Sequence, residues 1–271
     1  MQKLAEKYLR KESLPTIFCP GCGDGQILFA TIRAIDDLGI RKDLACVSGI
    51  GCSGWIPVYL NVDVMHAIHG RAIAAAEGLK LSSDDKKVIV FTGDGDCIGI
   101  GGNHFIHAAR RNIDLTVIMV NNNIYGMTGG QKAPTTPLKA YTKTSPYGNE
   151  ERPFDSIELA VAAGATYVAR WTTFHIQQLE LSIKNAINHN GFSFIEVLSQ
   201  CPVQAGRNIF NERDPWKIMK LFKDKTVGIG KDKDNRNNED KISIGEFVNR
   251  NEKEFGQLLS ETRRSINENK N

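Results

Sequence analysis

Two polar clusters follow apolar runs in the middle of the chain, and together they could hold a metal-bound diphosphate. The string GDGD (93–96) follows one apolar run, and NNN (121–123) follows the next. Glycines let backbone N–H groups approach phosphate oxygens closely, but a carboxylate beside phosphate needs a cation between them. Mg²⁺ prefers oxygen ligands and often joins protein oxygens to phosphates. The sequence therefore predicts magnesium ligands at Asp94, the Asn122 amide oxygen and a nearby backbone carbonyl.

An ordinary turn and a dinucleotide-binding loop are the competing interpretations of this pattern. The dinucleotide fingerprint is G-x-G-x-x-G, whereas this segment reads GDGDCIG, with Ile98 in place of the third glycine. The phosphate loop G-x-x-x-x-G-K-[ST] occurs nowhere in the chain. GDG alone often marks only a turn, but two such clusters after neighbouring strands are more specific.

Cysteines form the second group of residues that could do chemistry. FCPGCG (18–23) holds a C-x-x-C pair, and single cysteines lie in GIGCS (49–53) and QCP (200–202). The pair alone admits zinc, a redox dithiol or an iron–sulfur cluster. Zinc usually takes a second C-x-x-C or two histidines, and no second C-x-x-C exists here. Cys46 and Cys97 are interpreted as packing residues. The plausible ligand set is Cys19, Cys22, Cys52 and Cys201.

Alternating apolar runs and amphipathic segments must position these groups. Strands are predicted at 44–49, 87–92, 115–120 and 192–198, and helices at 25–38, 66–81, 103–112, 155–164 and 174–190. This alternation predicts an α/β fold with a mostly parallel sheet and helices on both faces. Ligands of such sheets bind beyond the carboxyl ends of the strands. Both polar clusters and two single cysteines are expected there, with a long ordered loop at 125–152.

Composition limits the classes of partner. The chain has 271 residues, is 41% hydrophobic and carries a net charge of only +3. That charge gives no reason to expect nucleic acid or an anionic membrane surface as partner. No segment approaches the roughly 20 apolar residues that span a bilayer, and the N-terminus lacks the apolar core of a signal peptide. We therefore expect a cytoplasmic protein with no membrane association.

The composition changes near residue 222, which suggests a cofactor-binding domain over 1–222 and a charged C-terminal extension over 223–271. KDKDNRNNEDK (231–241) has the composition of a solvated linker, and the pattern of residues 242–266 predicts an amphipathic helix. The extension is expected to be either a mobile, peripheral tail or an arm that docks on a partner subunit.

The spacing of GDG and NN and the string at 124–137 resemble motifs of a known enzyme family. GDG followed by about thirty residues and NN resembles the diphosphate and magnesium motif of thiamine-diphosphate enzymes. IYGMTGGQKAPTTP (124–137) closely resembles the beta subunit, which binds thiamine diphosphate, of 2-oxoacid:ferredoxin oxidoreductases. SGWIPVYLNVD followed by HGRA looks closest to the 2-oxoglutarate branch. The resemblance covers about residues 18–202, and it implies the thiamine-diphosphate-binding (diphosphate-domain) fold.

The resemblance also implies roles for individual residues. Magnesium would be bound by Asp94, Asn122 and the backbone carbonyl of Ile124, and one 4Fe–4S cluster by the four cysteines named above. His69 and Arg71, in HGRA, are candidates for catalysis, although a lone helical histidine is more often structural. The residues implied to contact the cofactor are Ile50, Gly51, Cys52, Ser53, His69, Gly95, Asp96, Gly126 and Met127.

The activity implied is oxidative decarboxylation of a 2-oxoacid with coenzyme A, giving an acyl-CoA, CO₂ and reduced ferredoxin. 2-Oxoglutarate is the preferred substrate, and pyruvate or a branched-chain 2-oxoacid remain open. A separate alpha subunit would carry the pyrimidine domain and the activating Glu, and gamma and delta subunits could join them. The alternatives are a non-redox thiamine-diphosphate decarboxylase subunit, which predicts no iron, and a zinc-stabilised binding module.

Overall fold

A single large sheet forms the centre of the molecule. The computed structural model describes residues 2–83, 85–230 and 241–268. The strand order is β2-β1-β3-β4-β8-β7-β10-β9, and every neighbouring pair is parallel except β7 with β10. The strands are β1 (Leu44–Ser48), β2 (Asp63–His66), β3 (Lys87–Gly93), β4 (Leu115–Asn121), β7 (Tyr167–Thr172), β8 (Phe192–Leu198), β9 (Thr226–Gly228) and β10 (Ile242–Asn249). The predicted α/β architecture is confirmed.

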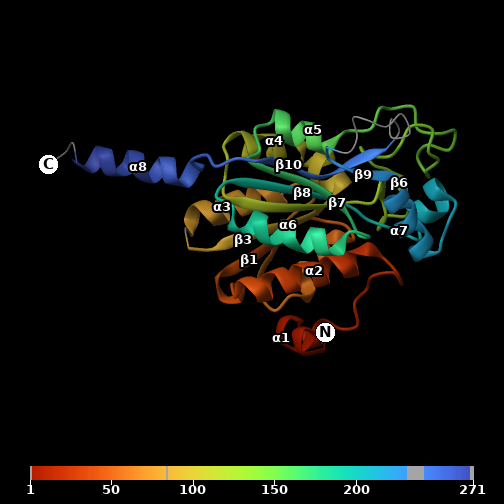
Figure 1. Ribbon diagram of the computed structural model, residues 1–271, viewed down its shortest axis with the longest axis horizontal. Coiled ribbons are helices and arrows are strands. Elements are labelled where there is room, and N and C mark those ends of the chain that lie inside the picture. Colours follow the sequence, from red (N-terminus) through yellow and green to blue (C-terminus); the bar gives the residue numbers. More distant parts are fainter. Residues whose placement is uncertain (1, 84, 231–240, 269–271) are drawn as a thin grey trace.

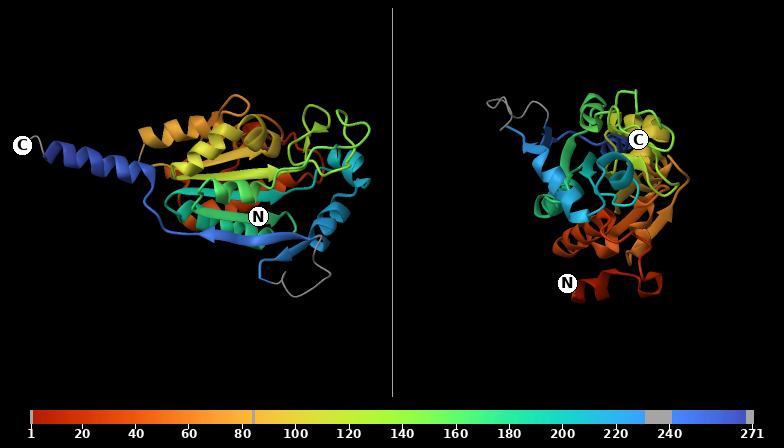
Figure 2. Two further views of the ribbon diagram at one scale, coloured as in Figure 1. Left: turned by 90° about the horizontal axis from the view of Figure 1, so that it is seen from above. Right: turned by 90° about the vertical axis from the view of Figure 1, so that its right-hand side faces the viewer.

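Helices cover both faces of this sheet (Figures 1 and 2). α2 and α6 pack on one face, and α3, α4 and α5 pack on the other. The helices are α1 (Gln2–Tyr8), α2 (Gly23–Leu38), α3 (Ala72–Ser82), α4 (Gly102–Arg110), α5 (Ser156–Ala162), α6 (Ile176–Asn188), α7 (Pro215–Asp224) and α8 (Phe255–Glu268). No helix in the described ranges is long and apolar enough to cross a bilayer.

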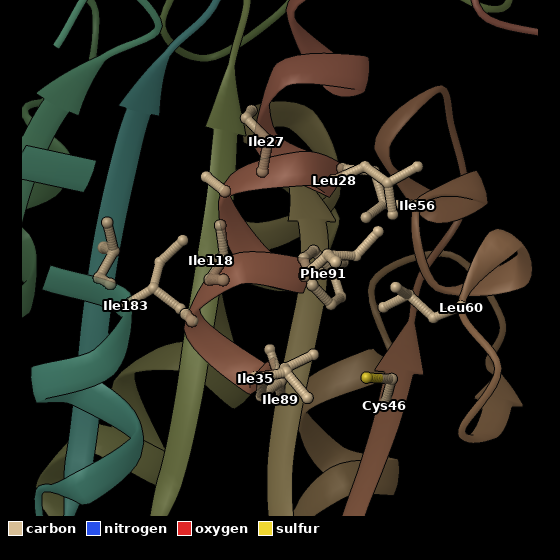
Figure 3. Close-up of a cluster of buried hydrophobic side chains, with 14 of the residues drawn as sticks. Ile27, Leu28, Ile35, Cys46, Ile56, Leu60, Ile89, Phe91, Ile118 and Ile183 are labelled. Atoms are coloured by element: carbon tan, nitrogen blue, oxygen red, sulfur yellow. The ribbon is translucent and has the colours of Figure 1, made fainter. Parts of the chain in front are cut away.

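The contact between α2 and the sheet shows why the apolar pattern folds this way (Figure 3). Ile27, Leu28 and Ile35 recur at helical spacing and are buried against Phe91 of β3 and Ile118 of β4. Burying each such side chain contributes about 1.5–3 kcal/mol. The helix ends at Gly39, whose φ of 67° is the left-handed conformation that glycine adopts without strain.

The central strands end level with one another. Gly93 at the end of β3 is paired with Val120 of β4, and Asn121 at the end of β4 is paired with Leu198 of β8. The segments that follow these strands therefore leave the sheet side by side. In Figure 1 the long loop and α7 lie at this end of the molecule, whereas α8 extends from the opposite end.

The long loop at 125–152 is present as predicted, apart from a short antiparallel pair, β5 (Ile124–Tyr125) with β6 (Gln131–Lys132). Its order comes from side-chain bonds to the backbone. Thr136 Oγ1 donates to the carbonyl of Asn123 at 2.6 Å, and Asn149 Nδ2 donates to the carbonyl of Thr136 at 2.8 Å. The loop is thus tied back to the end of β4.

Two expectations from the pattern were wrong within residues 1–222. The helix predicted at 66–81 begins only at Ala72, and β2 precedes it. Between them Gly70 has a φ of +75°, and a Cβ there would lie 2.6 Å from Ile100, so the helix does not extend back through this turn. Strand β7 was missing from the prediction because Arg170, buried in an ion pair with Glu196 of β8, interrupts its apolar run.

The C-terminal extension also differs from its pattern. Residues 242–249 form β10, not part of a helix, and they pair antiparallel with β7 in the main sheet. From Phe255 the chain is helical as expected, in α8. The expected linker lies almost wholly outside the described residues. The extension therefore contributes a strand to the main sheet, and α8 projects beyond it (Figure 1).

Candidate functional site

The segments that follow β1, β3 and β4 enclose a cavity of about 100 Å³. All nine residues expected at the cofactor line it, as do the three expected magnesium ligands Asp94, Asn122 and Ile124. Tyr125 and Thr128, which the sequence did not single out, also line it. The nine expected residues are Ile50, Gly51, Cys52, Ser53, His69, Gly95, Asp96, Gly126 and Met127. Their roles as ligands remain predictions.

Asp94 is a buried carboxylate without a basic partner among the described ion pairs, and only 3% of the residue is exposed. Thr135 Oγ1 donates a hydrogen bond to its Oδ2. Burial raises the pKa of Asp94 to about 7, because the charged form loses its hydration. The amide oxygen of Asn122, in the same cavity, accepts a hydrogen bond from the N–H of Ile124 at 3.2 Å. A divalent cation would supply the positive charge that Asp94 lacks.

The side chain of His69 lines the cavity and is held there by the buried carboxylate of Asp96. Its Nδ1 is bonded to Oδ1 of Asp96, which also accepts from the N–H of Gly70 at 2.7 Å. The other carboxylate oxygen of Asp96 accepts from Thr92 Oγ1 at 2.6 Å. Through these three contacts the carboxylate of Asp96 fixes the imidazole and the turn before α3.

Arg71 lies elsewhere. Its guanidinium is bonded to Nε2 of His104 on α4, and the residue is exposed and does not line the cavity. The left-handed turn at Gly70 directs the chain so that His69 and Arg71 face different surroundings. His69 thus lines the cofactor cavity and Arg71 does not, and the catalytic roles expected for the two residues remain predictions.

The four candidate cysteines line a second cavity of about 270 Å³. Burial raises the pKa values of the thiols of Cys22 and Cys201, and it raises that of Cys52 to about 12. These thiols are therefore neutral near pH 7 until a metal displaces their protons. The other two cysteines, Cys46 and Cys97, are buried in the two apolar cores on either side of the sheet, as expected.

A buried acid borders the cysteine cavity. Asp24 is 1% exposed, and the Sγ of Cys22 lies 3.3 Å from its Oδ2. Its Oδ1 has no hydrogen-bond partner within the described part of the chain, and burial raises the pKa of the carboxyl to about 6. A buried polar atom left unpaired is uncommon. Among the described residues, Asp24 is thus a buried acid with a free acceptor beside the cysteine cavity.

The thiols surround a space and do not converge on a point. Within residues 2–83, 85–230 and 241–268, no three Cys, His, Asp or Glu side chains lie close enough together to hold one metal ion. Thiolates bound to one zinc ion lie within about 2.3 Å of it. The arrangement of Cys19, Cys22, Cys52 and Cys201 is wider than that.

The two cavities share a wall. Cys52, Asn122, Gly126 and Met127 line both of them. At Gly126 a Cβ would lie 3.5 Å from the Sγ of Cys52 and 3.8 Å from that of Cys201. Groups bound in the two cavities would therefore be separated by no more than one layer of residues.

Asn121 belongs to the support of the site. Its Nδ2 donates to Oε1 of the buried Glu196 at 2.6 Å, and its Oδ1 accepts from the N–H of Asn123 at 3.1 Å. Both ends of the Asn121 amide are thus occupied, and this residue is not among the expected magnesium ligands. Thr135 is a supporting residue that the sequence did not reveal, because no local pattern marks a contact across the long loop.

The chain is similar in sequence and in fold to known proteins. Residues 49–197 match the family model for the C-terminal TPP binding domain of thiamine pyrophosphate enzymes. The chain is 53% identical over 259 residues to the 2-oxoglutarate synthase subunit KorB of Methanocaldococcus jannaschii, covering 94% of this chain and 95% of the relative. It is 57% identical over 195 residues to the KorB subunit of Archaeoglobus fulgidus, covering 72% and 73%.

A solved structure is similar over nearly the whole chain. It is that of 2-oxoglutarate:ferredoxin oxidoreductase from Magnetococcus marinus with 2-oxoglutarate, coenzyme A and succinyl-CoA bound, with a TM-score of 0.87 and 33% identity. The match covers 97% of this chain and 90% of the other. The chain therefore belongs to the family of 2-oxoglutarate synthase KorB subunits, the beta subunits of 2-oxoacid:ferredoxin oxidoreductases that contain a thiamine-pyrophosphate-binding domain.

Proposed function

We propose that this chain is the catalytic beta subunit of an enzyme that oxidatively decarboxylates 2-oxoglutarate with coenzyme A and passes the electrons to ferredoxin. The reaction gives succinyl-CoA and CO₂. The observation that carries the proposal is the shared wall: a cavity with a buried carboxylate and amide adjoins a cavity lined by four cysteines. KorB names among the most similar relatives support 2-oxoglutarate over pyruvate and branched-chain 2-oxoacids.

The residues that line the first cavity suit the diphosphate end of thiamine diphosphate with Mg²⁺. Asp94, the amide oxygen of Asn122 and the carbonyl of Ile124 offer three oxygens, and phosphate and water would complete the octahedron that magnesium prefers. Asp94 is buried and lacks a cation, so bound Mg²⁺ would remove an unfavourable interaction. Gly95 allows the ring of Tyr125 to pack against the backbone of this loop, since a Cβ there would lie 2.2 Å from that ring.

The second cavity fits a 4Fe–4S cluster held by Cys19, Cys22, Cys52 and Cys201. A cluster spreads its four thiolate ligands over four irons, which suits thiols placed around a cavity. The non-redox alternative has no use for these four thiols. Their raised pKa values mean that loading must release protons and will be weaker at low pH.

The protein's own groups orient and desolvate the reactants. Bound thiamine diphosphate supplies the nucleophilic carbon and a cationic ring that stabilises negative charge formed on decarboxylation. His69, fixed by Asp96, can hold a proton at its Nε2 at the cavity wall. The buried residues around Asp94 limit the access of water, which strengthens electrostatic interactions inside the site.

The active site is completed by another subunit. The beta chain supplies the diphosphate end of the site, and we propose that an alpha subunit brings the pyrimidine domain and the Glu that activates the cofactor. Gamma and delta subunits are further candidate members of the complex. The soluble partners are ferredoxin, coenzyme A and the 2-oxoacid.

The test is anaerobic production of the chain with its alpha subunit, followed by iron and sulfide analysis and turnover with a viologen acceptor. We expect about four irons per beta chain and turnover of 2-oxoglutarate ahead of pyruvate and branched-chain 2-oxoacids. Cys201→Ala should lose most of the iron, whereas Cys46→Ala, a matched change in the core, should keep it. Iron-free wild-type protein would exclude the redox function. Turnover of another 2-oxoacid with no turnover of 2-oxoglutarate would exclude 2-oxoglutarate as the substrate.

A further inference from the structure

Two consecutive glycines leave bare backbone at the rim of the cofactor cavity. Gly129 and Gly130 directly follow Thr128, which lines that cavity. Both have φ values above 100°, where side chains are strained. A Cβ at Gly129 would lie 2.8 Å from Nζ of Lys143, so the ammonium occupies the space that a side chain at position 129 would take.

Two carboxamides approach the neighbouring glycine. A Cβ at Gly130 would lie 2.8 Å from Oε1 of Gln204 and 3.1 Å from Nδ2 of Asn208. Both residues lie in the segment that follows Cys201, and Gln204 also lines the cysteine cavity. One cation and two amides therefore surround a short stretch of backbone where the two cavities meet.

Within the described part of the chain, the polar ends of these three side chains make no hydrogen bond or ion pair. Among the hydrogen bonds and ion pairs of the described residues, none involves the ammonium of Lys143 or the side-chain amides of Gln204 and Asn208. The contrast is Lys132, on the same loop, which is paired with Glu151. Ammonium and amide N–H groups are donors that recognise carboxylate and phosphate oxygens.

The backbone holds Lys143 in place. Its N–H donates to the carbonyl of Gly130 at 2.9 Å, and Thr144 Oγ1 accepts from the N–H of Lys132 at 2.9 Å. Residues 142 and 145 exchange backbone hydrogen bonds of 3.2 Å, which close the turn around Lys143. The lysine is thus presented from a bonded turn, so little backbone entropy is lost when its ammonium binds an anion.

We propose that Lys143, assisted by Gln204 and Asn208, binds an oxyanion of a substrate at the rim between the two cavities. This inference rests on the proposed function, which supplies two oxyanions in range of the cofactor: the distal carboxylate of a dicarboxylic 2-oxoacid and the phosphates of coenzyme A. Lys143 is a binding residue in either case and takes no part in bond making. It selects for ligands that carry negative charge away from the reacting carbon.

The experiment uses the anaerobic alpha/beta complex with three variants: Lys143→Gln, the conservative Lys143→Arg, and Lys139→Gln as a charge-matched control on the same loop. Lys139 is exposed and contributes nothing to the contacts around Gly129 and Gly130. Binding of 2-oxoglutarate and of coenzyme A is measured by calorimetry, and KM and kcat are measured for both. Thermal unfolding checks that each variant is folded.

We expect Lys143→Gln to weaken binding and raise the KM of one ligand about tenfold, as loss of an ion-assisted hydrogen bond does, with kcat within twofold. Lys143→Arg should stay within about threefold, and Lys139→Gln should match the wild type. If 2-oxoglutarate is affected and 2-oxobutyrate is not, the anion is the distal carboxylate. If coenzyme A is affected, comparison with dephospho-coenzyme A separates its 3′-phosphate from its diphosphate.

Unchanged binding of both ligands in Lys143→Gln would overturn the proposal, as would an equal effect of Lys139→Gln. Turnover of the wild-type complex is measured in the same preparation. Because calorimetry detects anion binding without turnover, failure of the proposed activity and failure of this binding site give different results.

Discussion

The hydroxyl of Thr135 donates a hydrogen bond to Oδ2 of Asp94, and so joins the long loop to the carboxylate at the end of β3. The two residues are far apart in the chain, yet both are at least 95% buried. The contact orients Asp94 from outside the proposed metal site. Two substitutions would distinguish the contribution of the Asp94 carboxylate to cofactor binding from that of the Thr135 hydroxyl.

Asp94→Asn should abolish detectable binding of thiamine diphosphate with Mg²⁺, because it removes the one carboxylate among the three proposed magnesium ligands. Thr135→Val keeps that carboxylate and should weaken cofactor binding by roughly tenfold, the usual effect of losing a residue that orients a metal ligand. Calorimetric titration of the complex with Mg²⁺ and cofactor measures both. Equal affinity of Asp94→Asn and wild type would exclude Asp94 as a ligand.

Substitution of His69 and substitution of Arg71 should have different effects on kcat. His69 lines the cavity, whereas Arg71 is exposed beside His104. His69→Gln should lower kcat by roughly a hundredfold, within the range observed for loss of a positioned proton donor or acceptor. Arg71→Gln should change kcat by less than about twofold. Steady-state kinetics of the two variants decides the matter, and a reversed order of effects would contradict the placement of the two side chains.

Gly95 should not tolerate even one methyl group. A Cβ there would lie 2.2 Å from the ring of Tyr125, whose hydroxyl donates to the carbonyl of Gly95 at 3.1 Å. Gly95→Ala should therefore displace Tyr125 and weaken cofactor binding at least tenfold.

Gly78 of α3 is the matched control, because no atom lies within 4 Å of its Cβ position. Gly78→Ala should stabilise the protein by about 0.5–1 kcal/mol. Denaturant unfolding and cofactor titration compare the two variants.

The free energy of unfolding should fall in mild acid, because His189 is buried in its neutral form. Its Nε2 is bonded to Thr166 Oγ1 at 2.8 Å, and burial lowers its pKa below the usual 6.5. The unfolded chain therefore takes up a proton before the folded one, so this stability is complete above pH 6.5 and is lost as the pH falls through the lower, folded pKa. Denaturant unfolding at pH 7.5, 6.5 and 5.5 should show a flatter decline for His189→Gln. If the free energy of unfolding fell equally steeply with pH in His189→Gln and in the wild type, His189 would not be the source of the pH dependence.

The strands that were predicted correctly have long apolar runs in the sequence. β3 and β4 form the middle of a covered parallel sheet, so their residues read as continuous apolar runs. β7 contains Arg170, which is tolerated only because Glu196 and Asp155 neutralise it. β10 mixes glycine and glutamate with apolar residues at the less covered side of the sheet. Local composition cannot reveal such long-range compensation.

The site was predictable to the extent that strand ends define it. Asp94, Asn122 and Cys201 follow strands whose ends are level in the sheet, so sequence position implied their proximity. Thr135 and Lys143 lie on an irregular loop, and only its hydrogen bonds decide where their side chains point. Arg71 was named from its place in HGRA, and the left-handed turn at Gly70 places it beside His104 and away from the cofactor cavity.

Cys19 and Cys201 border the same cavity, although about two thirds of the chain lies between them. A group bound by both thiols, such as the proposed cluster, closes the polypeptide into a large ring. Ring closure restricts the unfolded chain, and longer rings restrict it more. Oxygen that destroyed such a group would thus open the ring as well as remove an electron carrier. Oxidative damage would then show as proteolysis near the N-terminus.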